Sequence, residues 1–287
     1  MFSKKEYKQC TKEFRLEEPF DFFIYRPLAY LVVKLTYKLP LTPNHFSLLA
    51  LISALVGAYF MSLGEKWAFA IAGACIIAFS IFDCCDGMVA RMKKNGSKFG
   101  MQVDMFVDLI SNVALYICLF IGLGKQSYSY PIEYFSILCA LCIFLHASIY
   151  QYFKKQYQYY TDKNPVGRQR ELDYFRREFE LLKKESGHYF DKMLLKLFLL
   201  FTSAQKKDEK MDIYEVEKYS QYNISILPLW SMIAGSSHLT FLALALLLNE
   251  MPIYLYFALV VSNLWLILVY IIQNSVNSSI LIKKKAT

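Results

Sequence analysis

Residues 82–108 read FDCCDGMVARMKKNGSKFGMQVDMFVD and place four aspartates at the junction of two apolar segments. Asp83 and Asp86 are three residues apart, and Asp104 and Asp108 are four apart. Both spacings put the two side chains of a pair on one face of a helix. A short basic loop separates the end of the first segment from the start of the second. We therefore expect the four carboxylates to converge where two neighbouring helices meet.

The apolar segments beside the aspartates belong to a set that runs through the chain. Of its 287 residues, 56% are hydrophobic and 17% are aromatic, more than is usual for a soluble domain. A bilayer-spanning segment takes roughly 20 apolar residues and must be helical, because lipid cannot satisfy exposed strand edges. Six segments qualify: 45–63, 67–83, 102–123, 131–151, 223–248 and 252–273. The sequence predicts an all-α integral membrane protein with six transmembrane helices.

The basic residues gather in particular loops. The net charge is +8, and the excess lies after the second span, between residues 154 and 218, and at 283–285. The alternate loops are short and nearly uncharged. This pattern fits the positive-inside rule, with the aspartates and both termini on the cytoplasmic side of a multi-pass protein. Because membrane topology explains most of these charges, we expect no nucleic-acid partner.

Composition divides the rest of the chain. Residues 1–17 predict a loosely ordered polar tail, and 18–40 an interfacial juxtamembrane helix, too polar to span and too apolar for a tail. Thr42 and Pro43 are expected to begin the first span. The expected divisions are then 41–151 (transmembrane helices 1–4), 152–222 (a helical cytosolic insertion), 223–273 (transmembrane helices 5–6) and 274–287 (a cytosolic basic tail).

Within the insertion, two helices are expected. Residues 168–185 mix both signs of charge and predict a solvated helix. Residues 189–201 are apolar on one side, which fits either an interfacial helix or a helix packed on protein.

Four acids at membrane depth repel one another and lose hydration, so they need compensating cations. A salt-bridge cluster or a polar pore lining is the alternative, but the neighbouring cations are too few to pair with all four. Oxygen ligands suit Mg²⁺, Mn²⁺ or Ca²⁺ better than zinc. Four carboxylates can hold two ions, which can clamp the attacking and leaving oxygens of a phosphoryl displacement.

Small and basic residues near the aspartates fit phosphate chemistry as well. Gly87 and Gly100 allow a ligand to approach the backbone closely, and Ala90 is similarly small. Arg91 offers a bidentate fork for phosphate.

Together these residues resemble the signature of the CDP-alcohol phosphotransferase family. The pattern is D-x-x-D-G-x-x-A-R, eight residues, then G-x-x-x-D-x-x-x-D. Every fixed position is matched: Asp83, Asp86, Gly87, Ala90, Arg91, Gly100, Asp104 and Asp108. The plan of a juxtamembrane helix and six transmembrane helices is similar too, over about residues 18–151 and 223–273. The insertion gains no support from the family.

The resemblance implies a homodimeric membrane transferase that opens to the cytosol and binds two Mg²⁺ or Mn²⁺ ions. Asp83, Asp86 and Asp104 would bind metal and position the diphosphate, and Asp108 would be the general base while touching the second ion. Gly87, Ala90, Arg91 and Gly100 would line the cytidine diphosphate pocket with Asp83. Asn44 and Ser47 are similar to the family's Pro-Asn-x-x-Thr/Ser motif and would approach the nucleotide.

Two donor classes remain open. One class joins CDP-diacylglycerol to a polar alcohol such as a polyol, a polyol phosphate or serine; the other joins CDP-choline or CDP-ethanolamine to a lipid alcohol. The stretch 97–100, Ser-Lys-Phe-Gly, is similar to the first class, and Lys98 is a candidate for binding an acceptor phosphate. A divalent-cation transporter would need polar residues toward the outer leaflet, where these spans are apolar. An inactive scaffold is disfavoured by the intact signature.

Overall fold

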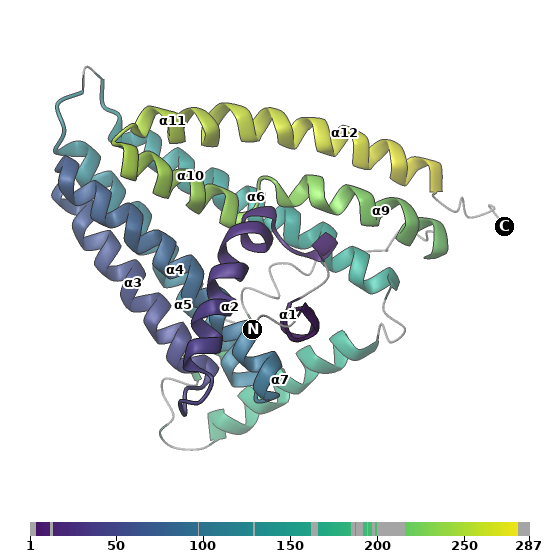
Figure 1. Cartoon of the computed structure of the whole chain (residues 1–287). Helices are drawn as coiled ribbons and strands as arrows, with labels where there is room; N and C mark the ends of the chain where they lie inside the picture. The colour runs from purple at the N-terminus through teal and green to yellow at the C-terminus, as the bar shows by residue number, and fades with distance from the viewer. Residues whose placement is uncertain are drawn as a thin grey trace. The chain divides into compact units, whose positions relative to one another are not determined.

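The computed structural model describes residues 4–11, 14–96, 98–128, 130–161, 166–184 and 216–280, with a few single positions between 187 and 199. Every regular element in these residues is helical, which confirms the expected fold class (Figure 1). In chain order they are α1 (Lys4–Cys10), η1 (Phe14–Leu16), η2 (Asp21–Tyr25), α2 (Arg26–Thr36), α3 (Pro43–Leu63), α4 (Lys66–Lys93), α5 (Lys98–Gly124), α6 (Glu133–Thr161), α7 (Val166–Lys184), α9 (Val216–Ser231), α10 (Gly235–Leu248), α11 (Met251–Tyr256), η3 (Phe257–Val261) and α12 (Ser262–Ile280).

Six helical stretches in the described residues are long and apolar enough to cross a membrane: α3, α4, α5, α6, α9 with α10, and α11 through α12. Several depart from the expected bounds: α6 ends ten residues past 151, and α12 ends seven residues past 273. α4 continues ten residues beyond the expected end at 83, so Asp83 and Asp86 lie inside the helix. The expected span 223–248 is interrupted between α9 and α10. Pro228 and Gly235, which weaken a helix, flank the interruption.

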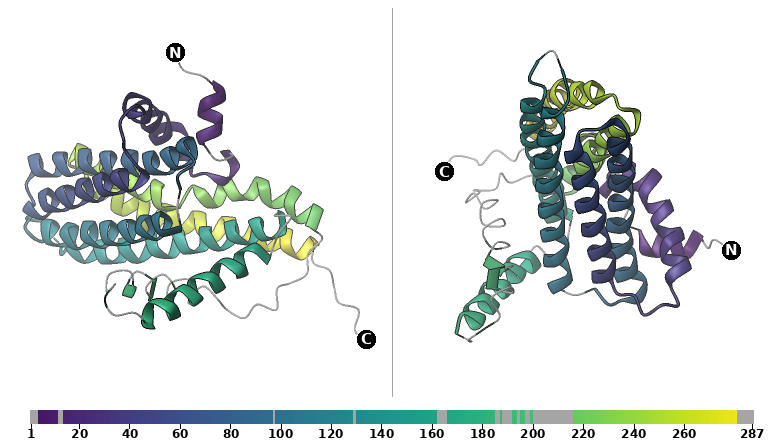
Figure 2. Two further views of the ribbon diagram at one scale, coloured as in Figure 1. Left: turned by 90° about the horizontal axis from the view of Figure 1, so that it is seen from below. Right: turned by 90° about the vertical axis from the view of Figure 1, so that its left-hand side faces the viewer.

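The chain forms two compact units, the first comprising 1–150 and 227–269 and the second 151–226 and 270–287. In the first unit α3 packs along both α4 and α5, and α4 packs against α10, as Figures 1 and 2 show. Glycines permit this close approach. A Cβ on Gly57 would lie 2.9 Å from the Cβ of Cys75, and one on Gly122 only 2.0 Å from the carbonyl oxygen of Met61. Small residues play this part where membrane helices meet.

The start of α3 follows the sequence prediction. Thr42 is the N-cap and Pro43 the first helical residue, and His45 Nδ1 accepts a hydrogen bond from the Thr42 backbone N–H at 3.1 Å. The side chains of α3 that face away from the core are exposed and apolar, as a lipid-facing surface requires: Leu48, Ile52 and Leu55.

The prediction of a loosely ordered tail over residues 1–17 is wrong for the part that the structure describes. Lys4–Cys10 form α1, and Cys10 is fully buried against residues of α2 and α4. Tyr30 of α2 donates a hydrogen bond to Glu6 of α1 at 3.2 Å. The segment is short and rich in charged residues, so its sequence did not distinguish a helix that packs on the protein from a polar tail.

A helical segment, η2 followed by α2, lies where the juxtamembrane helix was expected. The hydroxyl of Tyr25 lies 2.8 Å from Thr240 Oγ1 and joins η2 to α10. Two residues before Thr240 on α10, His238 Nε2 lies 3.0 Å from His146 Nδ1 and joins α10 to α6.

In the second unit, α7 forms where a helix of mixed charge was expected, and Lys183 pairs with Glu180 at 3.5 Å. Gln273 donates a hydrogen bond to Asn223 at 2.6 Å, which joins α12 to α9. Because α12 extends to Ile280, the expected basic tail is helical over 274–280. Most of the expected helix over 189–201, and the lysines at 283–285, lie outside the described residues.

Candidate active site

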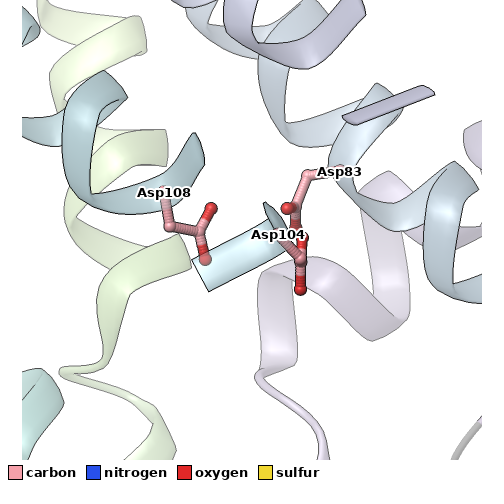
Figure 3. Close-up of side chains that lie close together, drawn as sticks. All are labelled: Asp83, Asp104 and Asp108. Carbon is pink, nitrogen blue, oxygen red and sulfur yellow. The ribbon is translucent and has the colours of Figure 1, made fainter. Parts of the chain in front are cut away.

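α4 and α5 bring three aspartates together. Asp83 lies on α4, and Asp104 and Asp108 lie one turn apart on α5. One carboxylate oxygen from each of the three lies within 4.8 Å of the others, and Figure 3 shows the carboxyl groups turned toward one another. The convergence expected from the sequence spacing is therefore present for Asp83, Asp104 and Asp108.

Asp86, the fourth aspartate, lies beside this group. Its side chain is buried on α4, one turn from Asp83, and interacts with the carboxyl of Asp104. Ser47 Oγ on α3 donates a hydrogen bond to Asp86 Oδ2 at 2.8 Å. The orientation of Asp86 is thus set by a third helix. Ser47, expected from the sequence to approach a nucleotide, contacts the aspartate cluster directly.

The composition of the cluster fits a hard divalent cation. Its donors are carboxylate oxygens, and among the described residues no histidine or cysteine joins them. Such a donor set suits Mg²⁺ or Mn²⁺. Like charges at this separation repel strongly in a weakly polar environment, and a divalent ion is the simplest group that removes this repulsion.

Arg91 lies two turns beyond Asp83 on α4 and bends back toward the cluster. A Cβ placed on Gly87 would lie 3.3 Å from Arg91 Nη2, so the glycine leaves room for the guanidinium beside the helix. Arg91 Nε donates a hydrogen bond to the carbonyl oxygen of Cys10. The side chain is therefore held from two sides, by its own helix and by α1.

The other residues predicted for the site differ in how close they lie to the aspartates and in how exposed they are. Ala90 is partly buried one turn beyond Asp86, and Gly100 lies one turn before Asp104. Asn44 is exposed at the second position of α3. The side chain of Lys98 lies outside the part of the structure that is described.

The acidic residues that precede α2 were not predicted from the sequence to belong to the site. The carboxylate of Glu18 accepts a hydrogen bond from the backbone N–H of Ser236 at 2.7 Å, at the start of α10. Desolvation raises the pKa of the Asp21 carboxyl well above its ordinary value, and the nearby carboxylates of Glu18 and Asp83 raise it further. Asp21 is thus a fifth acid next to the cluster. The only signal in the sequence was an acidic run within an aromatic segment.

The comparison with protein families agrees with this geometry. Residues 40–167 match the family model described as CDP-alcohol phosphatidyltransferase.

Residues 40–167 form a CDP-alcohol phosphatidyltransferase domain. The domain contains α3, α4 and α5 and all four aspartates. The family predicted from the eight signature residues is therefore confirmed for this part of the chain.

The chain also has curated relatives. It is similar to a phosphatidylinositol phosphate synthase of Corynebacterium glutamicum, with 37% identity over 87 residues, which are 30% of this chain and 38% of the relative. Proteins of the same name from Mycobacterium bovis and Mycobacterium tuberculosis are 28% identical over 104 residues, 36% of this chain and 46% of theirs. The similarity spans less than half of the length of these relatives.

Proposed function

We propose that this chain transfers a phosphatidyl group from CDP-diacylglycerol to a polar alcohol and releases CMP. The observation that carries the proposal is the convergence of the Asp83, Asp104 and Asp108 carboxylates inside an apolar helical unit. Acids in such a setting are functional by default, because their burial is otherwise unfavourable. The family match over residues 40–167 supports this reading.

The metal ligands in this proposal are Asp83, Asp86, Asp104 and Asp108, with Mg²⁺ or Mn²⁺ at two positions. When bound, the ions would neutralise charge on the donor diphosphate, as in other phosphoryl transfers. Ser47 would fix the orientation of Asp86 through the hydrogen bond at 2.8 Å. Residues that orient a ligand in this way commonly affect metal affinity by 10- to 100-fold.

The proposed reaction is a direct displacement at phosphorus. The oxygen of the acceptor hydroxyl attacks the phosphorus that carries diacylglycerol, and a new P–O bond forms. The bond from that phosphorus to the bridging oxygen breaks, and its electron pair leaves with CMP. The hydroxyl proton passes to a carboxylate oxygen of Asp108, the proposed general base. Base catalysis of this kind contributes about 10²–10⁴-fold to a rate.

The proposed nucleotide and diphosphate pocket follows the signature. Its lining residues are small or basic positions around the cluster: Asn44, Ser47, Asp83, Gly87, Ala90, Arg91 and Gly100. The position of the Arg91 guanidinium beside Gly87 supports this assignment, because a planar fork there suits a phosphate. Lys98 is proposed as a ligand of an acceptor phosphate.

A polyol phosphate is the favoured acceptor in this proposal. The support is the name of the relatives from three organisms, phosphatidylinositol phosphate synthase. Serine or a neutral polyol would be used by the same displacement. The alternative donors are CDP-choline and CDP-ethanolamine, with a lipid alcohol as acceptor.

Two features of the assembly are part of the proposal. The site and both termini face the cytoplasm, which the loop charges support, and the chain works as a homodimer. Labelling of single cysteines added at the termini in sealed vesicles tests the first. The mass of the detergent-solubilised protein tests the second, and a monomeric mass would contradict it.

An assay of CMP release tests the proposed reaction. Purified full-length protein with Mg²⁺ or Mn²⁺ is given CDP-diacylglycerol with a panel of polyols, polyol phosphates and serine, or CDP-choline with diacylglycerol. We expect CMP release with the first donor and at least one polar alcohol. We also expect Asp108→Asn to be inactive while Glu133→Gln, which alters an acid at the start of α6, keeps the wild-type rate. If CMP were released only with CDP-choline, the assignment of CDP-diacylglycerol as the donor would be wrong. Wild-type turnover by Asp108→Asn would contradict the assignment of Asp108 as the general base.

A further inference from the structure

Arg26, the first residue of α2, was not among the site residues predicted from sequence. Its guanidinium is largely buried, with the side chain 10% exposed, and it forms an ion pair with the buried carboxylate of Glu17. It lies close enough to Asp21 on η2 and to Cys84, next to Asp83, for their charges to interact. The juxtamembrane segment therefore places one buried cation close to Asp21 and to the residue that follows Asp83.

Arg26 shares its environment with Arg91. The charge of each guanidinium acts on the thiol of Cys10, and the charge of Arg26 acts on Arg91 itself. Arg91 reaches this position because Gly87 has no side chain, and Gly87 is one helical turn, about 6 Å, from Asp83. Two arginines from different helices thus lie close enough for their charges to interact, and the charge of Asp86, a proposed metal ligand, acts on Arg91.

Each guanidinium has a nitrogen that points to no protein acceptor. Among the described residues, Arg26 Nη1 and Arg91 Nη2 are buried and have no hydrogen-bond partner. Arg26 is neutralised by Glu17, whereas Arg91 Nε donates to a neutral carbonyl. Buried N–H groups without an acceptor disfavour the folded state, and the half-buried charge of Arg91 adds to this cost unless an anion joins them. Phosphate oxygens suit them best, because guanidinium nitrogens bind them in a fork.

We propose that Arg26 and Arg91 together bind a phosphate group of a substrate beside the aspartate cluster, with Glu17 holding Arg26 in position. The inference rests on the proposed function and adds a juxtamembrane residue to its binding site. The phosphate belongs either to the diphosphate of the donor or to a phosphorylated acceptor. Both sources offer the same chemistry to the two arginines, and binding experiments separate them.

The test measures binding of two probes to Mn²⁺-loaded, full-length protein in detergent: CDP for the donor and inorganic phosphate for the acceptor. The variants are Arg26→Lys, which keeps the charge and loses the fork, and Arg26→Met. Because Arg26→Met removes the cation that pairs with the buried carboxylate of Glu17, the second form combines Glu17→Gln with Arg26→Met, so that neither charge of this ion pair remains. Lys38→Met removes an exposed positive charge from the same segment and is the matched control.

We expect both Met-bearing variants to bind one probe about 10- to 100-fold more weakly than wild type, Arg26→Lys to be intermediate, and Lys38→Met to be unchanged. Weaker binding of CDP assigns the pair to the donor diphosphate, and weaker binding of phosphate alone assigns it to the acceptor. Folded variants that bind both probes like wild type would overturn the inference while leaving the proposed reaction intact. A wild-type protein that binds neither probe and releases no CMP would remove the proposed function itself.

Discussion

Ser47 on α3 donates a hydrogen bond of 2.8 Å to Asp86 on α4, across 39 residues of sequence. Through this bond the first transmembrane helix sets the orientation of an aspartate that it does not carry. Because Asp86 also interacts with Asp104 on α5, we expect a change at Ser47 to affect both aspartates.

Replacing Ser47 by alanine removes that bond and leaves a buried carboxylate oxygen with one donor fewer. We expect Ser47→Ala to raise the Mn²⁺ concentration needed for half-maximal CMP release by about 10- to 100-fold, as for other residues that orient metal ligands. Ser53→Ala is the matched control, since Ser53 lies on the same helix, is partly exposed, and donates a hydrogen bond to the carbonyl oxygen of Leu49 on its own helix. An unchanged metal requirement in Ser47→Ala would show that Asp86 needs no such support.

The packing of α5 against α3 depends on Gly122. A Cβ at this position would lie 2.0 Å from the Met61 carbonyl oxygen. Because that oxygen belongs to the backbone, one of the two helices would have to shift to relieve the clash. Overpacking of this kind costs about 1–3 kcal/mol or more, so we expect Gly122→Ala to lower the melting temperature of the detergent-solubilised protein.

Gly124, two residues further along α5, is the matched control for this substitution. A Cβ there meets no heavy atom closer than 3.8 Å, which is ordinary contact with Glu133. We expect Gly124→Ala to melt within a degree or two of wild type, since small surface changes alter stability little. Equal melting temperatures for the two variants would contradict the observed approach of α3 and α5.

The hydroxyls of Tyr116 on α5 and Tyr254 on α11 form a buried hydrogen bond. Changing either tyrosine to phenylalanine leaves the other hydroxyl buried without this partner, which costs about 1–3 kcal/mol. Changing both removes the unpaired group. We therefore expect the double variant to be more stable than the sum of the two single effects predicts, as read from melting temperatures. Strict additivity would mean that the two hydroxyls do not interact.

Cys10 reports on the docking of α1. Burial raises the pKa of its thiol, an effect that the nearby Arg91 partly offsets. Since the thiolate is the reactive form, a raised pKa keeps Cys10 protonated at pH 7–8, and its alkylation becomes faster as the pH rises toward that pKa. We expect iodoacetamide to label Cys10 slowly at pH 7.5 in folded protein and rapidly after unfolding in SDS, measured by peptide mass spectrometry. If Cys10 were labelled as fast in the folded protein as in SDS, residues 1–17 would be a loosely ordered tail after all.

Local spacing was enough to predict the centre of the site. The i, i+3 and i, i+4 separations of Asp83, Asp86, Asp104 and Asp108 fix which faces they share, and the short loop between α4 and α5 forces those faces together. The start of α3 was equally predictable, because the residue types of an N-cap and a first helical proline are specific.

Features that depend on tertiary packing were not predictable in this way. Arg26 and Asp21 lie about sixty residues before Asp83 in sequence, and only the docking of η2 and α2 on α4 brings them near it. The interruption between α9 and α10 was hidden because hydropathy continues across it. Because α10 begins after this interruption, the backbone N–H of Ser236 is available to donate a hydrogen bond to Glu18. The two residues are far apart in sequence, so no local pattern predicts this contact.

The aspartate cluster is proposed to hold divalent ions, and direct titration of Mn²⁺ tests this proposal. Electron paramagnetic resonance of the free ion in a titration of detergent-solubilised protein gives the number bound and their affinity. We expect wild-type protein to bind Mn²⁺, with two ions per chain when CDP is present, and the Asp83→Asn, Asp104→Asn double variant to bind none at the same concentrations. Folded wild-type protein that binds no Mn²⁺, or a double variant that binds it equally well, would contradict the account.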